Sequence, residues 1–530
     1  MLKTISTDVL VIGAGLTGLR AALAASRLGK KVLVLSKGPR CSYGVMGFNA
    51  AVGKDDSSEL YYEDILASGK GLGDKTLAYI LSSNSTRELR FLEQNGLHFE
   101  KTAQGEYDLL QPLGCSRPRL VHIGRFTGAR SEKVFLEKLE QSKVPIAFDA
   151  TVLDLLAADG RVCGALAVAQ NQLICCAASS VVVAAGGGGA LYPVTTYPEG
   201  LHGDSYAMMA RAGAELIDME FIQFEPCCLA EPTALKGKGI STTMLNAGAR
   251  LLNADGREFL SDYISDIKTM QKAGLSRAMY AEMQKSGGKP LLYDLRSIGK
   301  DELEMHCLWT KELTDAGFDP GKVPLRVCPA AHTFLGGAKV NERCETSLKG
   351  LFAAGEAMGG LHGANRIGGC AGAETYVFGA IAGETAAKSV EGEPPSRQAE
   401  KLAEELLASY SPQGNEAHGL VARLKKELSD SVSRGLSVVR AEDGILAAAE
   451  VAVRTEEALR QILWTSPEQL AECIELKNMA LVSRMISAAS LARQESRGAF
   501  YRSDYPMQRQ QFERNHSITV QNGEIAISVQ

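Results

Sequence analysis

The sequence lacks a surplus of positive charge, long apolar runs and a recognisable export signal. Its 57 Lys and Arg residues face 62 Asp and Glu residues, for a formal net charge of −5, which argues against a nucleic-acid partner. Apolar runs such as residues 180–185 are strand-sized, whereas a membrane span needs about 20 residues. The N-terminus has no charged segment followed by an apolar core and a cleavage site. We therefore expect a cytoplasmic protein without a membrane span.

The cysteines lack the spacing of a metal or haem site. Twelve are present, but none forms a Cys-x-x-Cys motif, and no His pair completes a zinc spacing. An iron–sulfur cluster needs a tighter cysteine run. We predict no metal site and reduced, mostly buried thiols. The adjacent pairs Cys175–Cys176 and Cys227–Cys228 have no explanation in the sequence.

The N-terminal segment predicts a βαβ unit. Residues 8–12 form an apolar strand, 16–28 an amphipathic helix and 31–35 a second strand. With 530 residues, the chain is long enough for two or three domains.

Three glycines follow the first strand at a spacing typical of dinucleotide binding. Gly13 and Gly15 permit a tight turn that brings a diphosphate close to backbone N–H groups, and Gly18 lets the helix pack on the strand. The second strand ends in Ser36-Lys37, without the acidic residue that usually holds the ribose hydroxyls. Alone, this motif is a weak signal.

A second glycine-rich stretch, residues 361–369, follows the segment 349–356. Together with the N-terminal glycines, about 350 residues away, it indicates one dinucleotide and specifically FAD. Between the two, residues 151–156, 161–169 and 172–177 predict an antiparallel meander, followed by a buried strand that ends at 185–189.

The remaining chain divides by pattern. Residues 226–335 are a mixed, polar insertion, after which the dinucleotide-binding pattern resumes at about 336 and closes near 390. From 393 onward, helical periodicity dominates to about 499.

These motifs resemble the flavoprotein subunits of fumarate reductase and succinate dehydrogenase, and also L-aspartate oxidase. The likeness runs from residue 8 to about 506. It is carried by residues 13–18, 33–39, 185–189, 203–208, 219–224, 349–384, 495–498 and 504–506.

The resemblance implies an α/β fold with three parts. A Rossmann-like FAD-binding domain of the glutathione-reductase type would comprise residues 1–225 and 336–392. An inserted α+β capping domain would comprise 226–335, and a helical C-terminal domain 393–530. The active site would lie between the flavin and the cap.

The resemblance also implies the residues that hold FAD. Members of this family often use a pair such as Ser36-Lys37 in place of the ribose acid. The predicted contacts are Gly13, Gly15, Leu16, Thr17, Gly18, Ser36, Lys37, Gly44, Gly47, Ala185, Gly186, Gly187, Asp204, Gly355, Glu356, Arg366, Ala371 and Gly372.

Several family members attach FAD covalently through a His after the second strand. This chain has Arg40-Cys41-Ser42-Tyr43 there and no His between residues 1 and 97. We therefore expect non-covalent FAD, as in L-aspartate oxidase. A thioether to Cys41 is the less favoured alternative.

The resemblance assigns three catalytic positions. Arg277 matches the arginine taken as proton donor, and His332 and Arg366 match the pair that binds one substrate carboxylate. A guanidinium offers a planar fork to a carboxylate, and the imidazole adds a donor.

The other half of the family's site differs in this chain. A carboxylate-binding His is replaced by Glu225, and the proton-relay Glu and Arg are replaced by Thr242 and Leu245. A lone Glu about 4 Å from a substrate carboxylate would cost roughly 4 kcal/mol at an effective dielectric of 20, about a thousandfold in affinity. Glu225 would instead pair with a cationic or hydrogen-bond-donating group, or reprotonate Arg277. The alternative is that Glu225 forms a salt bridge within the cap.

We therefore expect an FAD-dependent oxidoreductase that acts on a Cα–Cβ bond next to a carboxylate, on a substrate other than a plain C4 dicarboxylate. The alternatives are a fumarate reductase or succinate dehydrogenase subunit proper, an amino-acid oxidase similar to L-aspartate oxidase, and an electron-transfer subunit without its own substrate. The chain has no cluster or haem motif, so a separate iron–sulfur subunit is an expected partner. Such a partner could hold the protein at the membrane periphery.

Overall fold

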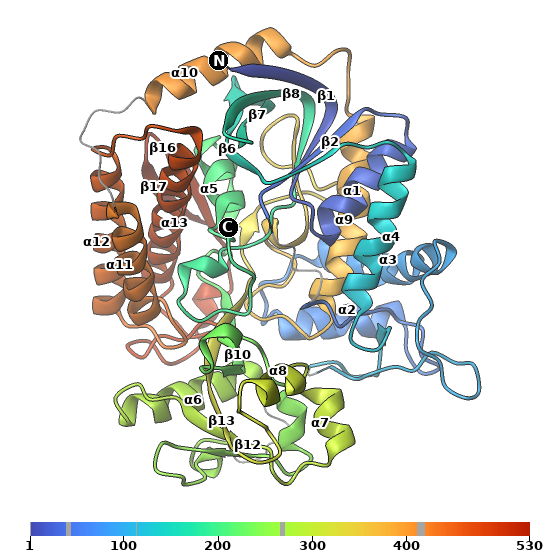
Figure 1. Ribbon diagram of the computed structural model, residues 1–530, viewed down its shortest axis with the longest axis vertical. Coiled ribbons are helices and arrows are strands. Elements are labelled where there is room, and N and C mark those ends of the chain that lie inside the picture. The colour runs from blue at the N-terminus through green and yellow to red at the C-terminus, as the bar shows by residue number, and fades with distance from the viewer. Residues whose placement is uncertain (1, 39–43, 113, 265–270, 411–418) are drawn as a thin grey trace.

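The computed structural model describes residues 2–38, 44–112, 114–264, 271–410 and 419–530 (Figure 1). The strands are β1 (Lys3–Ile12), β2 (Val32–Ser36), β3 (Gly47–Asn49), β4 (Leu120–His122), β5 (Ile146–Phe148), β6 (Ala150–Ala158), β7 (Arg161–Ala169), β8 (Gln172–Val183), β9 (Leu216–Ile217), β10 (Ile222–Leu229), β11 (Arg250–Leu252), β12 (Leu291–Asp294), β13 (Leu325–Phe334), β14 (Gly337–Ala338), β15 (Leu351–Ala353), β16 (His516–Gln521) and β17 (Glu524–Val529). The α-helices are α1 (Leu16–Arg27), α2 (Ser58–Ser68), α3 (Lys75–Gln94), α4 (Thr127–Gln141), α5 (Asp204–Arg211), α6 (Lys272–Lys285), α7 (Lys300–His306), α8 (Thr310–Asp315), α9 (Cys370–Lys388), α10 (Ser396–Ser409), α11 (Leu420–Gly435), α12 (Glu442–Leu459) and α13 (Pro467–Ala492).

The largest sheet has the order β5-β2-β1-β8-β7-β6, with β15 also paired to β8. Strand β1 runs parallel to β2 and to β8, whereas β6, β7 and β8 form an antiparallel meander. The predicted βαβ unit and meander are thus confirmed. One detail differs: the last meander strand and the buried strand after it are a single strand, β8, which pairs with β7 on one side and β1 on the other.

Helices cover this sheet, and two of them pack closely against each other. Val9, Leu10 and Val11 in β1 are fully buried, as expected for a strand with both faces covered. Helices α1 and α9 cross closely, because a Cβ at Gly383 would stand 2.1 Å from the carbonyl oxygen of Ala21. Glycine at this crossing lets the two helix backbones come into contact.

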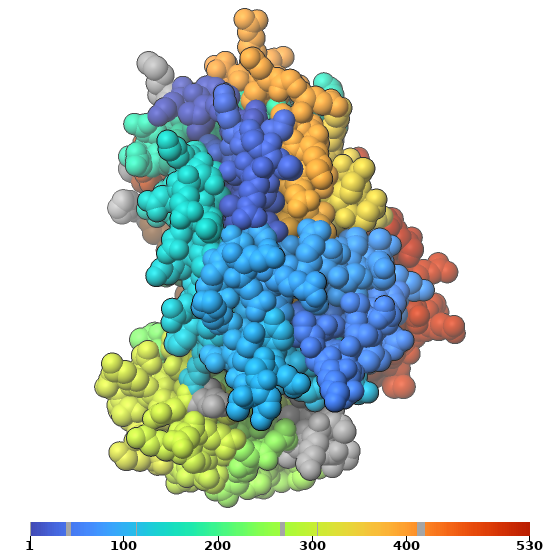
Figure 2. All heavy atoms as spheres, turned by 90° about the vertical axis from the view of Figure 1, so that its right-hand side faces the viewer, coloured from blue at the N-terminus to red at the C-terminus, as the bar shows by residue number. Residues whose placement is uncertain are grey.

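The inserted segment builds its own sheet, with the order β10-β13-β12-β11, and the helices α6, α7 and α8. Its apolar core includes Leu229, Phe259, Met279 and Tyr293, all of them buried. Figure 2 shows this green and yellow cap below the blue helices of the N-terminal body. Strands β10 and β13 are antiparallel neighbours, so residues of both strands lie together where the cap meets the rest of the molecule.

The C-terminal segment begins with the predicted helices, α10 to α13, of which α11, α12 and α13 lie side by side at the left of Figure 1. A hairpin that the periodicity did not predict follows. Strand β16 pairs with both β17 and β9 in a sheet of order β14-β9-β16-β17. The chain end is therefore anchored to the middle of the sequence. None of the helices in the described ranges is long and apolar enough to cross a membrane.

Candidate cofactor and substrate site

The glycines after β1 have two different tasks. Gly13 has φ +109°, and a Cβ there would lie 2.4 Å from the carbonyl oxygen of Ala184. A Cβ at Gly18 would lie 1.8 Å from the oxygen of Gly13. These two glycines let the turn, β8 and α1 pack together, so replacing either would disturb the fold itself.

Gly15 differs, because a Cβ there would meet no protein atom within 4 Å. It caps the N-terminus of α1 with φ −71° and lines an open cavity. The unpaired N–H groups and the positive end of the helix dipole at this point suit a diphosphate. The predicted FAD residues that line this cavity are Gly13, Gly15, Leu16, Thr17, Ser36, Lys37, Ala185, Gly186, Asp204 and Glu356.

The other predicted FAD residues do not line this cavity: Gly18, Gly44, Gly47, Gly187, Gly355, Arg366, Ala371 and Gly372. Several are packing glycines. A Cβ at Gly372 would stand 2.5 Å from the oxygen of Gly47, and one at Gly355, with φ +62°, would stand 2.4 Å from Oγ1 of Thr17. The expected absence of a covalent link concerned Arg40 to Tyr43, which lie outside the described residues.

Glu356 lies where the cofactor cavity meets β13. Its Oε1 accepts hydrogen bonds from the backbone N–H of Phe334, at 2.8 Å, and from the Tyr197 hydroxyl. Burial raises the pKa of Glu356 to about 7 despite these donors. The group can therefore hold a proton close to neutral pH beside the cofactor cavity.

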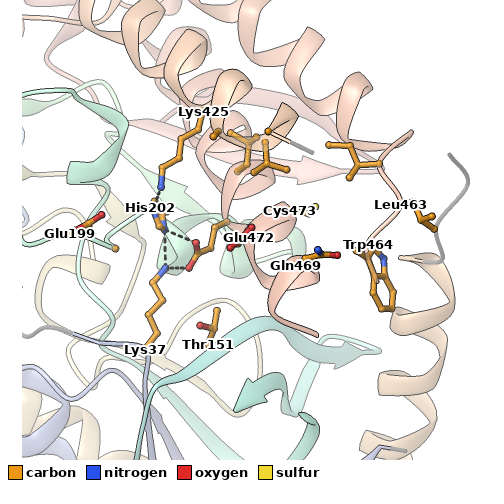
Figure 3. Close-up of a pocket in the computed structure, with 17 residues that line it drawn as sticks. Lys37, Thr151, Glu199, His202, Lys425, Leu463, Trp464, Gln469, Glu472 and Cys473 are labelled. Carbon is orange, nitrogen blue, oxygen red and sulfur yellow. Dashed lines mark hydrogen bonds and ion pairs between the residues drawn. The ribbon is translucent and has the colours of Figure 1, made fainter. Parts of the chain in front are cut away.

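Lys37 joins the cofactor cavity to a second cavity of about 600 Å³, which lies against the C-terminal helices (Figure 3). Its ammonium lies 2.5 Å from Asp204, 2.8 Å from Glu475 and 3.0 Å from Nδ1 of His202. The other ring nitrogen of His202 lies 2.8 Å from the ammonium of Lys425. Burial opposes the charge of Lys37, but the two carboxylates outweigh it and raise the pKa. Lys37 thus lines the cofactor cavity while its ammonium is held by the carboxylates of Asp204 and Glu475.

Arg366 lies in the loop before α9 and is 9% exposed. Its Nη2 donates to Oε1 of Gln223 at 2.8 Å and, more weakly, to Oγ1 of Thr333 at 3.4 Å. Its buried Nε has no hydrogen-bond partner, and no carboxylate lies within ion-pair distance among the described residues. A buried cation without a counter-ion is costly, so this guanidinium is suited to an incoming anion.

His332 and Glu225 are brought together with Arg366, as the resemblance implied. His332 Nε2 lies 3.9 Å from Oε2 of Glu225, and its Nδ1 lies 2.9 Å from the Thr196 hydroxyl. Burial lowers the pKa of His332 to about 3, although Glu225 opposes that shift. The imidazole is therefore neutral at physiological pH, and it can act as a neutral hydrogen-bonding group beside the cationic Arg366.

Glu225 is not a lone charge. Lys272, at the start of α6, forms an ion pair with its Oε2. Burial alone would raise the pKa of Glu225, but the charges of Lys272 and Arg366 lower it, so the group is ionised at neutral pH. The repulsion expected for an isolated glutamate is therefore offset by an adjacent ammonium, and the salt-bridge alternative describes the contact that is present.

Arg277 shares helix α6 with Lys272 but has different neighbours. Its Nη1 lies 3.5 Å from the oxygen of Gly498, and its guanidinium lies 5.2 Å from the ring centre of Tyr501. Burial lowers the pKa of Arg277, which makes it a better proton donor than an exposed arginine. Its role as proton donor stays a prediction.

The positions expected to replace the proton relay carry no charge. Thr242 and Leu245 lie in one 3-10 turn, and Leu245 is part of the apolar core of the cap. Cys227 also lies in that core, and Cys228 donates to the backbone oxygen of Glu225 at 3.6 Å. Burial raises the pKa of both thiols, so they are packed, protonated groups in β10.

Comparison with known proteins places this architecture in a family. Residues 8–371 match the FAD binding domain model, and residues 425–530 match the model of the fumarate reductase flavoprotein C-terminus. The chain belongs to the fumarate reductase and succinate dehydrogenase flavoprotein family. It is an FAD-dependent oxidoreductase.

Similar proteins span the full length of the chain. One subunit of the CoM/CoB fumarate reductase of Methanothermobacter marburgensis is 32% identical, with 96% of each chain covered. L-aspartate oxidase of Streptomyces coelicolor is 30% identical, covering 99% of this chain and 93% of its own. Among solved structures, FrdA of E. coli quinol fumarate reductase is 27% identical, with a TM-score of 0.90 over 100% of this chain and 97% of its own. The fold assignment, with its FAD-binding, capping and helical parts, is thus confirmed.

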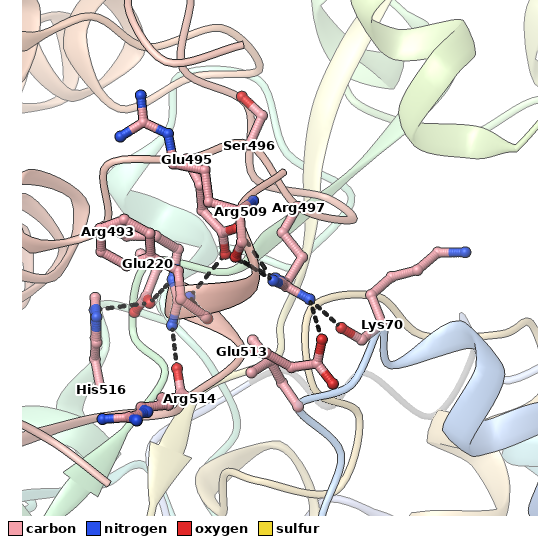
Figure 4. A network of polar contacts seen from close by, with 12 residues as sticks. Lys70, Glu220, Arg493, Glu495, Ser496, Arg497, Arg509, Glu513, Arg514 and His516 are labelled. Carbon is pink, nitrogen blue, oxygen red and sulfur yellow. Dashed lines mark hydrogen bonds and ion pairs between the residues drawn. The ribbon is translucent and has the colours of Figure 1, made fainter. Parts of the chain in front are cut away.

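A buried ionic network holds the loop of residues 493–498, which follows α13, next to this site (Figure 4). Arg493 is fully buried, with Nε 2.6 Å from Glu220 and Nη1 3.1 Å from Glu495. Arg497 pairs with Glu495 at 2.7 Å and donates to the backbone oxygen of Lys70 at 2.5 Å. The network therefore joins the C-terminal segment to the N-terminal body.

The same loop supports two predicted catalytic residues. Gly498 has φ +57°, and the N–H of Ala499 donates to the oxygen of Ala364 at 2.8 Å, two residues before Arg366. The oxygen of Gly498 faces Arg277. Sequence reasoning recognised this loop by resemblance alone and did not name its acidic partner, Glu220.

Lys272 is one of the site residues that the sequence analysis did not predict. It lies 47 positions after Glu225, and no local pattern marks it as a partner. Its position in the first turn of α6, five residues before Arg277, is the feature that could have suggested a place in the site.

Proposed function

We propose that this protein acts on a Cα–Cβ bond next to a carboxylate, as a 2-enoate reductase or as the reverse dehydrogenase. The observation that carries the proposal is Arg366, a buried guanidinium without a carboxylate partner among the described residues. A guanidinium that no protein carboxylate neutralises suits a substrate carboxylate. His332, neutral and adjacent to Glu225, would complete the binding of that carboxylate.

Bound FAD would supply the two-electron chemistry. The protein's own residues would position and polarise the substrate. Arg366 would hold the carboxylate and draw electron density toward it, which favours addition at the carbon furthest from the carboxylate. Arg277, whose pKa burial lowers, is the candidate donor of the proton to the other carbon.

We propose that the substrate is not a plain C4 dicarboxylate. Arg277 is assigned to proton donation, and Lys272, among the described residues, is already paired with Glu225. A second carboxylate would have to break that pair, whereas an uncharged or cationic group would not. A fumarate reductase or succinate dehydrogenase proper is the alternative, and the likeness to named fumarate reductases supports it.

An amino-acid oxidase is a second candidate, because L-aspartate oxidases are among the relatives at 30% identity. Such an enzyme would form an imine and release hydrogen peroxide on reoxidation by oxygen. An electron-transfer subunit without its own substrate is less favoured, since such a protein has no need for an unpaired Arg366.

We also propose a separate electron partner carrying an iron–sulfur centre. The sequence has no Cys-x-x-Cys or haem-attachment motif of its own. Two relatives bear names that identify them as subunits. The protein would then act in the cytoplasm or at the membrane periphery through that partner.

A dye-linked assay tests the proposal. The purified holoprotein, with reduced viologen as electron donor, would be given fumarate, crotonate, urocanate, cinnamate and L-aspartate, and peroxide would be measured in parallel under air. We expect oxidation of the dye by a monocarboxylic enoate and no peroxide with L-aspartate. Peroxide formed with an amino acid would favour the oxidase, and turnover of fumarate alone would identify an ordinary fumarate reductase.

A further inference from the structure

Lys272 lies in the first turn of α6 and forms an ion pair with Glu225, which lies beside His332. Its side chain is 27% exposed, and the side chain of its partner Glu225 is 12% exposed. The same oxygen of Glu225 that binds Lys272 also lies 3.9 Å from Nε2 of His332. The pair therefore lies next to the group proposed to help hold the substrate carboxylate.

The two charges of the pair cancel. Burial opposes ionisation of Glu225, but Lys272 outweighs it, so the pKa is lowered and the carboxylate is charged at neutral pH. The neighbouring His332 is neutral. Among the described residues, Arg366 and Arg277 therefore have no carboxylate within ion-pair distance, whereas Lys272 and Glu225 form a neutral ion pair beside His332.

We propose that Lys272, held by Glu225, determines which substrates this site accepts. An ammonium offers donors only and a carboxylate acceptors only. Together they complement a group that both accepts and donates, such as a primary amide. This inference rests on the proposed function, and the substrate class that it names is a 2-enoate with a carboxamide at its far end.

Three four-carbon probes test the inference: fumarate, its monoamide and 4-aminocrotonate carry a negative, neutral and positive far end. Their Kd values for the oxidised holoprotein would be measured by the change in the visible flavin spectrum, which needs no turnover. For the native protein we expect the monoamide to bind about tenfold or more tightly than fumarate.

Removing either member of the pair should shift these relative affinities in opposite directions. Glu225→Gln frees the ammonium, so the Kd of fumarate should fall about tenfold or more relative to that of the monoamide. Lys272→Met leaves the carboxylate unpaired, so 4-aminocrotonate should gain by a similar factor and fumarate should become the weakest ligand.

Two matched controls remove the same charges elsewhere. Lys285→Met changes an exposed lysine on the same helix, and Glu231→Gln an exposed acid just beyond β10. Both should keep the native order of affinities. The FAD content and melting temperature of each variant would show whether it is folded. If only one of Glu225→Gln and Lys272→Met folds, that variant alone is sufficient to test the inference.

An unchanged ratio of fumarate to monoamide affinity in a folded Glu225→Gln protein would overturn the role of Lys272. If the native protein binds none of the three probes, the proposed function fails together with this inference. Binding of all probes in an order insensitive to both variants would refute only the inference.

Discussion

Replacing Gly15 with Ala should separate FAD binding from folding. Gly15 has φ −71°, which Ala adopts freely, and its Cβ would meet no protein atom within 4 Å. The new methyl group would instead occupy the cavity at the N-terminus of α1, where the cofactor diphosphate is expected. Loss of one or two charge-assisted hydrogen bonds, each worth about 1.5–3 kcal/mol, predicts a Kd for FAD that rises by roughly 10- to 10⁴-fold.

The assay is titration of the apoprotein with FAD, followed by the quenching of flavin fluorescence, together with the melting temperature of the apoprotein. Gly274→Ala is a matched control, because its Cβ also meets no protein atom within 4 Å but lies on α6 of the cap. Gly18→Ala should instead unfold the protein, since its Cβ would lie 1.8 Å from Gly13. A Gly15→Ala protein that binds FAD as tightly as the native protein would refute the cofactor placement.

Three further predictions concern charge. Arg366→Met should weaken binding of a monocarboxylic enoate by about 2–3 kcal/mol, seen as a Kd raised roughly 30- to 150-fold in a spectral titration, and an unchanged Kd would show that the carboxylate binds elsewhere. Because burial holds the pKa of His332 at about 3, its ring gains no proton as pH falls from about 8 to 6, whereas Glu356, whose pKa is about 7, does. In a Glu356→Gln protein the Kd of the enoate should therefore stay constant over this range, and a marked tightening toward about pH 6 in that variant would contradict a neutral His332. Arg493→Met should leave the buried Glu220 without its guanidinium partner, beside His516, and lower the free energy of unfolding by about 3–5 kcal/mol, measured by denaturant titration. Arg343→Met, which is exposed, should change it by less than about 0.5 kcal/mol, and equal effects would refute the importance of the network.

The cofactor half of the site could be predicted because its signals are local. Gly13, Gly15 and Gly18 lie within six positions of one another, and the strand before them is a continuous apolar run. Their positions in the structure follow directly from the turn between β1 and α1. The family resemblance added the distant segment that contains Glu356 and Arg366.

The substrate half could not be predicted to the same depth. Whether Glu225 is a lone charge depends on Lys272, and their contact is set by the packing of α6 on β10, which leaves no periodic trace in the sequence. The final hairpin was missed for the same reason, because β16 pairs with β9 about 300 residues earlier. Long-range contacts of this kind need the folded structure.

A single-turnover experiment tests the central claim most directly. The FAD of the purified protein would be photoreduced without oxygen, mixed with the fumarate monoamide or with crotonate, and the flavin spectrum and the products would be recorded. The account predicts rapid reoxidation of the flavin with one saturated carboxylate formed per flavin, and loss of this reaction in the Arg366→Met protein. A reduced flavin that persists with every enoate, or that is reoxidised equally well without Arg366, would contradict it.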